Sequence, residues 1–152
     1  MTAVLALGSN LGDRLAHLRA AVRLLQPTAV SPIYETDPVG LVEQPDFLNA
    51  VVLVDTDAAG AWELALQAEW AAGRTREVRW GARTLDVDVI VADGAAADLE
   101  LPHPRAAERA FVLAPWLDLQ PDAQLPGRGA VADLLAALDR SGLRRRDDLV
   151  LT

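Results

Sequence analysis

The run of residues 83–91, Arg-Thr-Leu-Asp-Val-Asp-Val-Ile-Val, most constrains how this chain can fold. Its β-branched content and its alternation predict a β-strand, in which successive side chains point to opposite faces. One face is apolar, whereas the other carries Asp86 and Asp88 side by side before it turns apolar at Ile90. Two ionised carboxylates about 6 Å apart repel by roughly 2–3 kcal/mol at an effective dielectric constant near ~20. A divalent cation would remove this repulsion; two solvated aspartates on a half-exposed strand are the plain alternative.

The composition limits the class of protein. The chain has 152 residues, 51% of them hydrophobic, and we expect a single domain over residues 1–152. It has no cysteine, which excludes a disulfide framework, a thiolate metal site and a cysteine nucleophile, and fits a cytoplasmic location. No apolar run approaches the roughly 18 residues of a membrane span, so we expect no membrane partner.

The charge limits the partners further. A formal net charge of −8 argues against nucleic acid as the general partner, so any anion site must be local. All 14 basic residues are arginines, which excludes a Schiff-base lysine and the lysine of a Walker loop. A GC-rich coding sequence alone would give the same arginine usage.

Apolar periodicity predicts the order of the elements. We expect strands over residues 3–7, 29–34 and 47–54, a helix that stops at Pro27 and a second helix over 58–72. After the strand at 83–91, the Asp93-Gly94 pair predicts a hairpin with a return strand over 97–101. A last amphipathic helix starts near Val131 and ends near Gly142, and residues 144–148 are typical of plain surface.

The order strand, helix, strand, strand, helix, strand predicts an α+β fold with a ferredoxin-like βαββαβ antiparallel sheet and helices on one face. We expect its first and last strands to be neighbours at the centre. The C-terminal extension, from Asp93 onward, should lengthen the sheet edge and cover it. The Gly8-Ser9-Asn10 turn matches no phosphate-binding fingerprint, and we interpret it as structural.

A basic segment leads directly into the strand with the two aspartates. Residues 73–83 carry four arginines and one glutamate, a local charge of 4 − 1 = +3 in an acidic chain, which favours a polyanion site over an ordinary solvated loop. Glu69 lies on the apolar stripe of the helix before it and needs a partner.

Two further patterns remain open on the residues alone. Phe47 and Asn49 share one strand face, which is typical either of a ligand wall or of a buried, hydrogen-bonded asparagine. His103 lies between two prolines and is either a turn residue or a preorganised phosphate donor. It could converge with Arg109 on one anion if a helical turn lies between them.

Five ordered motifs carry a resemblance that spans nearly the whole chain. They are residues 6–12 (ALGSNLG), 34–40 (YETDPVG), 44–50 (QPDFLNA), 79–88 (RWGARTLDVD), and 102–104 (PHP) with 109–111 (RAF). With these motifs the chain resembles the 6-hydroxymethyl-7,8-dihydropterin pyrophosphokinases of folate biosynthesis, which transfer pyrophosphate from ATP to a pterin.

The resemblance implies the following roles. Asp86 and Asp88 would hold two Mg²⁺ ions and, with Arg74 and Arg83, form the catalytic set. Contacts to ATP would come from Glu69, Arg74, Arg83, His103 and Arg109. Contacts to the pterin would come from Thr36, Val39, Phe47, Asn49, Trp80 and Phe111. The partners would then be small molecules, and we expect a monomer.

The sequence departs from the family pattern at two places. Phe47 stands where a tyrosine is common, so ring stacking is kept and a phenol hydrogen bond is not. Several family members carry a lysine in the basic segment, a role that would here fall to Arg76 or Arg79.

Two other classes remain as alternatives. A palm-like nucleotidyl transferase also places paired aspartates on a ferredoxin-like sheet, but it would release pyrophosphate. A non-enzymatic module that binds a small molecule or RNA is the second alternative. The acidic charge and the lack of an aromatic pair within one strand weigh against its RNA-binding form.

Overall fold

All pairings in the main sheet of this protein are antiparallel within the part of the chain that the computed structural model describes, residues 1–37, 45–73 and 84–152. The strand order is β5-β1-β4-β3-β8, and β2 also pairs with β4. The strands are β1 (Ala3–Ser9), β2 (Ala29–Val30), β3 (Tyr34–Thr36), β4 (Phe47–Val54), β5 (Asp86–Val91) and β8 (Leu143–Arg145), with β6 (Gln124–Leu125) and β7 (Gly129–Ala130) as a separate pair. The helices are α1 (Arg14–Leu25), α2 (Ala58–Ala71), the 3₁₀ turn η1 (Ala106–Glu108), α3 (Ala110–Leu119) and α4 (Val131–Ala136).

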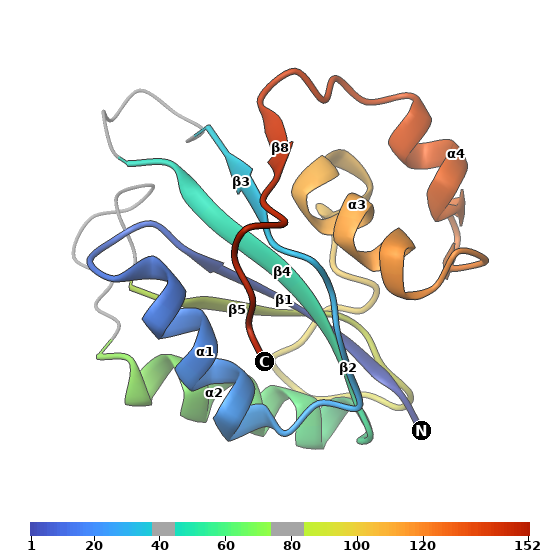
Figure 1. Ribbon diagram of the computed structural model, residues 1–152. Helices are drawn as coiled ribbons and strands as arrows, with labels where there is room; N and C mark the ends of the chain where they lie inside the picture. The colour runs from blue at the N-terminus through green and yellow to red at the C-terminus, as the bar shows by residue number, and fades with distance from the viewer. Residues whose placement is uncertain (38–44, 74–83) are drawn as a thin grey trace.

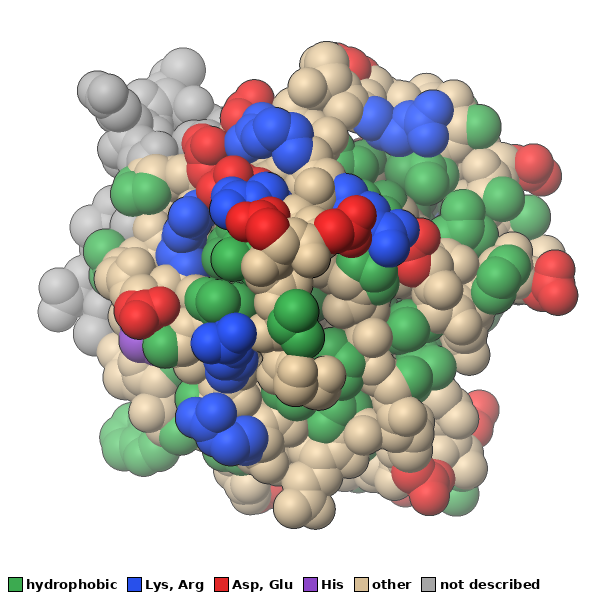
Figure 2. Space-filling model, viewed as in Figure 1, with side chains coloured by type: hydrophobic (Ala, Val, Ile, Leu, Met, Phe, Trp, Pro, Cys, Tyr) green, Lys and Arg blue, Asp and Glu red, His purple; other side chains and the backbone are tan. Residues whose placement is uncertain are grey.

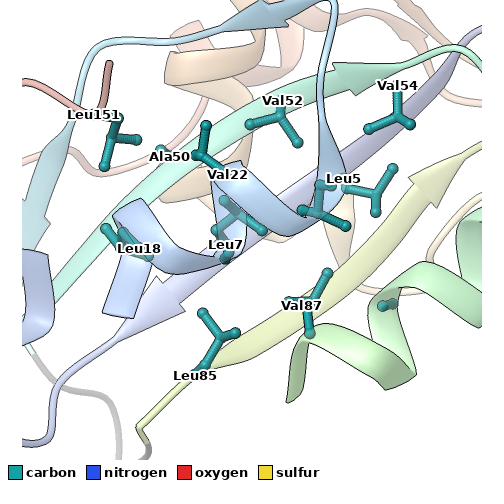
Figure 3. Packing of buried hydrophobic residues seen from close by; sticks show 14 of the residues in the cluster. Leu5, Leu7, Leu18, Val22, Ala50, Val52, Val54, Leu85, Val87 and Leu151 are labelled. Atoms are coloured by element: carbon teal, nitrogen blue, oxygen red, sulfur yellow. The ribbon is translucent and has the colours of Figure 1, made fainter. Parts of the chain in front are cut away.

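Helices cover both faces of this sheet, α1 and α2 on one face and α3 with α4 on the other (Figure 1). Side chains of a strand alternate between faces. Strand β1 therefore contributes Leu5 and Leu7 to the core under α1 and α2, and Val4 and Ala6 to the core under α3. Figure 3 shows the first core, where side chains of β1, β4, β5 and α1 meet. Burial on both faces fixes the direction of each side chain.

Local signals explain the two helices of the first face. Asp13 caps α1 by accepting a hydrogen bond from the Ala16 N–H at 3.1 Å, and Asp57 caps α2 by accepting one from the Gly60 N–H at 2.9 Å. The first helix stops before Pro27, as the sequence predicts. The predicted α+β, ferredoxin-like order of elements is confirmed. The prediction of helices on one face is incomplete, because α3 and α4 form a second helical layer on the other face.

Two predictions about the sheet are wrong. Strand β1 does neighbour β5, but the central strands are β1 and β4, and β5 lies at the edge of the described sheet. No return strand forms over residues 97–101, where the described chain has only an isolated bridge between Ala96 and Leu99. Leu99 and Leu101 pack against the core instead, so their alternation reflects burial and not strand pairing.

The strand predicted over residues 29–34 is divided into β2 and β3. Pro32, which has no N–H to donate, lies in the gap. Ser31 bridges the gap, because its N–H donates to the Val51 carbonyl at 2.9 Å and its Oγ accepts from the Val51 N–H at 2.8 Å.

Residues 144–148 lie at the surface, as predicted, but the prediction omits that Arg144 and Arg145 belong to a strand. Strand β8 pairs with β3, and the last residues continue over the first face, where Leu151 is 7% exposed in the core beside α1 (Figure 3). The final predicted helix is shorter than its pattern, since α4 ends at Ala136. Within the described ranges, no helix has both the length and the apolarity that a membrane crossing needs.

A cluster of charges joins β8 to the rest of the sheet at Glu35. Its carboxylate accepts a hydrogen bond from Arg14 at 2.6 Å and one from Arg146 at 2.9 Å, and its side chain is only 14% exposed. The hydrogen bond from Arg14 is the main reason that the pKa of Glu35 lies below its ordinary value of 4.5; partial burial opposes this and Arg146 adds to it.

Replacing Glu35 with glutamine should therefore destabilise the fold in a pH-dependent way. A carboxyl group whose pKa is lower in the folded state stabilises that state above its unfolded pKa, and this stability is lost as the pH falls through the folded pKa. We expect E35Q to lower the free energy of unfolding by about 1–3 kcal/mol at pH 7. The difference from the unsubstituted protein should shrink below the ordinary pKa of 4.5. Urea unfolding of both proteins across this range measures it; a difference independent of pH would contradict the assignment.

Candidate functional site

On the face of the sheet that α3 covers, residues of β4, β1 and β5 lie side by side and form a partly polar surface. We call this surface the floor; it consists of Asn49, Gly8, Ala6, Asp86 and Asp88. In the register of the sheet Gly8 of β1 lies between Asn49 of β4 and Asp86 of β5, and Ala6 lies next to Asp88. Gly8 has no side chain and Ala6 has only a methyl group, so β1 places little side-chain bulk between Asn49 and the two aspartates. A Cβ atom on Gly8 would lie 3.3 Å from Asn49 Oδ1 and 3.6 Å from the ring of Phe47.

The side chains of Arg109 and His103 converge on Asp88. Arg109 donates from Nη1 to Asp88 Oδ2 at 3.3 Å, and His103 Nε2 lies 3.9 Å from Oδ1. The 3₁₀ turn η1 separates the two residues along the chain, which is the helical turn that their predicted convergence requires. The Asp88 side chain remains 41% exposed, so a ligand can reach it.

His103 is held by its own backbone and by the turn that follows. Its N–H donates to the Ile90 carbonyl at 2.8 Å, and its Nδ1 accepts the N–H of Arg105 at 3.2 Å. Nδ1 is therefore the acceptor, and Nε2 carries the proton that points towards Asp88. Burial lowers the pKa of His103 below its ordinary value of 6.5, against the opposing effect of Asp88, so the imidazole is neutral at neutral pH. His103 is therefore part of a turn, with Nε2 on the side of Asp88. Its predicted contact with phosphate stays a prediction.

The other end of the floor is set by Asn49. Its Nδ2 donates to Thr36 Oγ1 at 2.9 Å and to the Tyr34 carbonyl at 3.4 Å, and the residue is 4% exposed. These two acceptors fix the position of Nδ2, so the amide is turned with its acceptor Oδ1 towards Gly8. Asn49 is therefore buried and hydrogen-bonded, and it shares one face of β4 with Phe47. The predicted role of this pair as a ligand wall stays a prediction.

Phe111 lies on the same side of the sheet, in the first turn of α3. It packs at the border of the core under α3, and the Arg109 guanidinium carbon lies 5.7 Å from the centre of its ring. This spacing is within the range of a cation–π contact. Arg109 is thus positioned by Asp88 and Phe111 together.

Glu69 is placed apart from these residues. It lies on α2, across the sheet from the two aspartates, and its Oε2 accepts the N–H of Val87 at 3.0 Å. Because β5 is the edge strand of the described sheet, this bond satisfies a donor that has no neighbouring strand. The predicted contact of Glu69 with ATP stays a prediction.

Four of the predicted site residues lie outside the described residues: Val39, Arg74, Trp80 and Arg83. The same holds for Arg76 and Arg79. Their predicted roles stay predictions.

Cation binding at this site would rest on Asp86 and Asp88. Among the described residues no group of three or more histidine, aspartate or glutamate side chains could enclose a metal ion. Mg²⁺ usually binds to one or two carboxylates together with substrate phosphates and water rather than to a complete protein cage. The donor set of two neighbouring carboxylates fits that kind of ion.

The floor residues Gly8 and Ala6 were not among the predicted site residues. The interpretation of Gly8-Ser9-Asn10 as a structural turn omits that Gly8 lies in β1 and separates Asn49 from Asp86. A glycine inside a strand is a signal of close approach by another group, and this signal was available in the sequence.

Comparison with known proteins gives one family. The family model of 7,8-dihydro-6-hydroxymethylpterin-pyrophosphokinase (HPPK) matches residues 4–121. A Mycobacterium leprae protein named 2-amino-4-hydroxy-6-hydroxymethyldihydropteridine pyrophosphokinase is 49% identical over 165 aligned positions, which cover 93% of this chain and 86% of the relative. A Bacillus subtilis protein of the same name is 44% identical, with 86% of this chain and 85% of the relative covered.

A solved structure agrees with the fold. A crystal structure of an HPPK-DHPS in complex with substrates superposes with a TM-score of 0.68 at 12% identity and covers 95% of this chain. This chain corresponds to 46% of that longer chain. At this identity the likeness concerns the fold alone.

Proposed function

Because the chain belongs to the 7,8-dihydro-6-hydroxymethylpterin-pyrophosphokinase family, we propose that it transfers pyrophosphate from ATP to the hydroxymethyl group of 6-hydroxymethyl-7,8-dihydropterin. The products are AMP and the pterin diphosphate, an intermediate of folate biosynthesis. The observation that carries the proposal is the convergence of His103 and Arg109 on Asp88, which is 41% exposed and shares one face of β5 with Asp86.

The phosphate end of the site is assigned to β5 and η1. Transfer to a hydroxyl group needs in-line positioning and charge neutralisation more than covalent help from the protein. Asp86 and Asp88 would hold two Mg²⁺ ions, which would neutralise phosphate charge and align the reacting groups. Arg109 and the neutral His103 donate hydrogen bonds to phosphate oxygens from the same side. Arg74 and Arg83 complete the proposed phosphate contacts.

The pterin end is assigned to β3, β4 and the start of α3. The ring lies over Gly8 between Phe47 and Phe111, since a planar heterocycle is well served by aromatic faces. Asn49 accepts from a ring N–H through Oδ1 while Thr36 holds its amide group. Val39 and Trp80 remain proposed contacts.

Filling the floor should block this end without unfolding the protein. Valine at position 8 places its side chain against Asn49 Oδ1 and Phe47. The strand itself should persist, because a branched side chain suits a strand. We expect G8V to raise the KM for the pterin by about tenfold or more and to leave the KM for ATP near its original value. G8A, whose single Cβ needs only a small shift of its neighbours, should have a much weaker effect. Steady-state kinetics for each substrate measures this, and an unchanged KM for the pterin in G8V would contradict the proposed floor.

AMP formation tests the reaction itself. The purified protein is incubated with ATP, Mg²⁺ and 6-hydroxymethyl-7,8-dihydropterin, and nucleotides are separated by chromatography. AMP should appear only when the pterin is present, and chelation of Mg²⁺ should stop it. No AMP above the control without pterin would overturn the proposal. Pyrophosphate release with nucleotide attached to the acceptor would support the nucleotidyl transferase instead.

We further propose that the protein acts as a monomer in the cytoplasm, where ATP and Mg²⁺ are supplied. Sedimentation equilibrium at assay concentration measures the mass, and a stable dimer would contradict this part.

A further inference from the structure

The three consecutive arginines 144–146 reach both faces of the sheet. Strand β8 pairs with β3 so that Arg144 lies opposite Glu35 and Arg145 opposite Tyr34. Because neighbouring side chains of a strand point to opposite faces, Arg144 and Arg146 lie on the side of α1, and Arg145 lies on the side of α3. Figure 2 shows arginine and acidic side chains gathered over this part of the molecule.

Arg144 joins the ends of two strands. Its Nη1 lies 3.1 Å from Asp37 Oδ1, and its Nη2 lies 2.9 Å from Asp46 Oδ2. Asp37 directly follows Thr36 at the end of β3, and Asp46 directly precedes Phe47 at the start of β4. One guanidinium group therefore connects the residues next to two proposed pterin contacts.

Three more hydrogen bonds lie at the same place. The Asp37 N–H donates to the Gly142 carbonyl at 3.3 Å, just before β8. Arg14 of α1 donates to both Glu35, at 2.6 Å, and the Asp46 carbonyl, at 3.0 Å. The end of β3 and the start of β4 are therefore joined from α1 and from β8 together.

The exposure of the Arg144 ion pairs limits how much they can contribute to the stability of the fold. The Arg144, Asp37 and Asp46 side chains are 43%, 62% and 40% exposed, and ion pairs between exposed side chains contribute little to stability because water screens them. The effect on global stability is therefore small. A small displacement of Thr36 relative to Phe47 acts directly on the ligand, because Thr36 also holds the Asn49 amide group.

We infer that Arg144 is a positioning residue for the pterin end of the site, which fixes the spacing of Thr36 and Phe47 by holding Asp37 and Asp46. This inference rests on the proposed function. It gives the C-terminal strand a part in substrate affinity although none of its residues belongs to the proposed contact set.

Kinetics separates positioning from a general structural role. In R144Q we expect the KM for the pterin to rise about three- to tenfold, the factor that the loss of two exposed ion pairs corresponds to. The KM for ATP and the melting temperature should stay close to those of the unsubstituted protein. R144K should give an intermediate KM, because an ammonium group binds one carboxylate at a time. The matched control is R140Q, at an exposed arginine for which the described residues show no ion pair, and it should change nothing.

A second measurement does not depend on activity. Hydrogen–deuterium exchange of the ligand-free protein should be faster in R144Q than in R140Q for peptides that contain Thr36 or Phe47. With an active unsubstituted enzyme, an unchanged KM for the pterin in R144Q, or an equal loss for both substrates together with a lower melting temperature, would overturn the inference. If the unsubstituted protein makes no AMP, the proposed function fails, and unchanged exchange in R144Q would then refute the ordering of the strand ends separately.

Discussion

Replacing Asp88 with asparagine should lower kcat by about 10²–10³-fold or more, the loss seen when one preorganised electrostatic contact to a transition state is removed. Asparagine keeps the shape of the side chain but removes the charge that a cation needs. It also removes the charge that Arg109 faces at 3.3 Å. D86N should have a similar effect, because the two carboxylates share one face of β5.

The fold should survive both substitutions. Asp88 is 41% exposed, and its loss as a partner costs the folded state about 0–1 kcal/mol. D122N, at an exposed position in the turn after α3, is the control and should be fully active. Kinetics at saturating ATP and pterin, with thermal unfolding of each variant, measures the difference. Full Mg²⁺-dependent turnover in both D86N and D88N would contradict the role of the paired aspartates.

Replacing Arg109 with glutamine should mainly affect ATP. Glutamine removes the positive charge between Asp88 and the Phe111 ring, so we expect kcat/KM for ATP to fall by about 10²-fold. Lysine at this position should restore part of the loss as a point charge without the planar fork. R23Q, at an exposed site on α1, is the control. The kinetics of R109Q and R109K measure this; if only the KM for the pterin changed, the assignment of Arg109 to the phosphates would be wrong.

The sequence predicts the chemistry of the site better than the shape of the sheet. Strict alternation in residues 83–91 is enough to place Asp86 and Asp88 on one face, and the same rule places Phe47 and Asn49 on one face of β4. The convergence of His103 and Arg109 follows from a single turn of helix. These predictions depend on local geometry, which a sequence encodes directly.

Other features depend on contacts between distant segments. Strand β8 is three residues long, and two of them are arginines, so its pairing with β3 has no local signal. Helix α3 is apolar on most sides and contains Pro115, so periodicity does not reveal it. The central position of β4 follows from packing the whole sheet, and the false strand at 97–101 arises because buried leucines can alternate without pairing.

Asn49 depends both on local geometry and on contacts with a distant segment. Its place beside Phe47 is predictable, but the direction of its amide is set by Thr36 and the Tyr34 carbonyl, which belong to another strand. The position of Gly8 likewise depends on distant segments, since only the register of β1 with β4 and β5 places it between Asn49 and Asp86.

The fate of the β-phosphorus of ATP tests the central claim most directly. ATP labelled at that atom is incubated with Mg²⁺, the pterin and the protein, and the products are separated. If the site transfers pyrophosphate, the label should appear in the pterin product and AMP should be unlabelled. The D88N variant should form almost no labelled pterin product. Label that remains in ADP, or that appears in free pyrophosphate, would contradict the account.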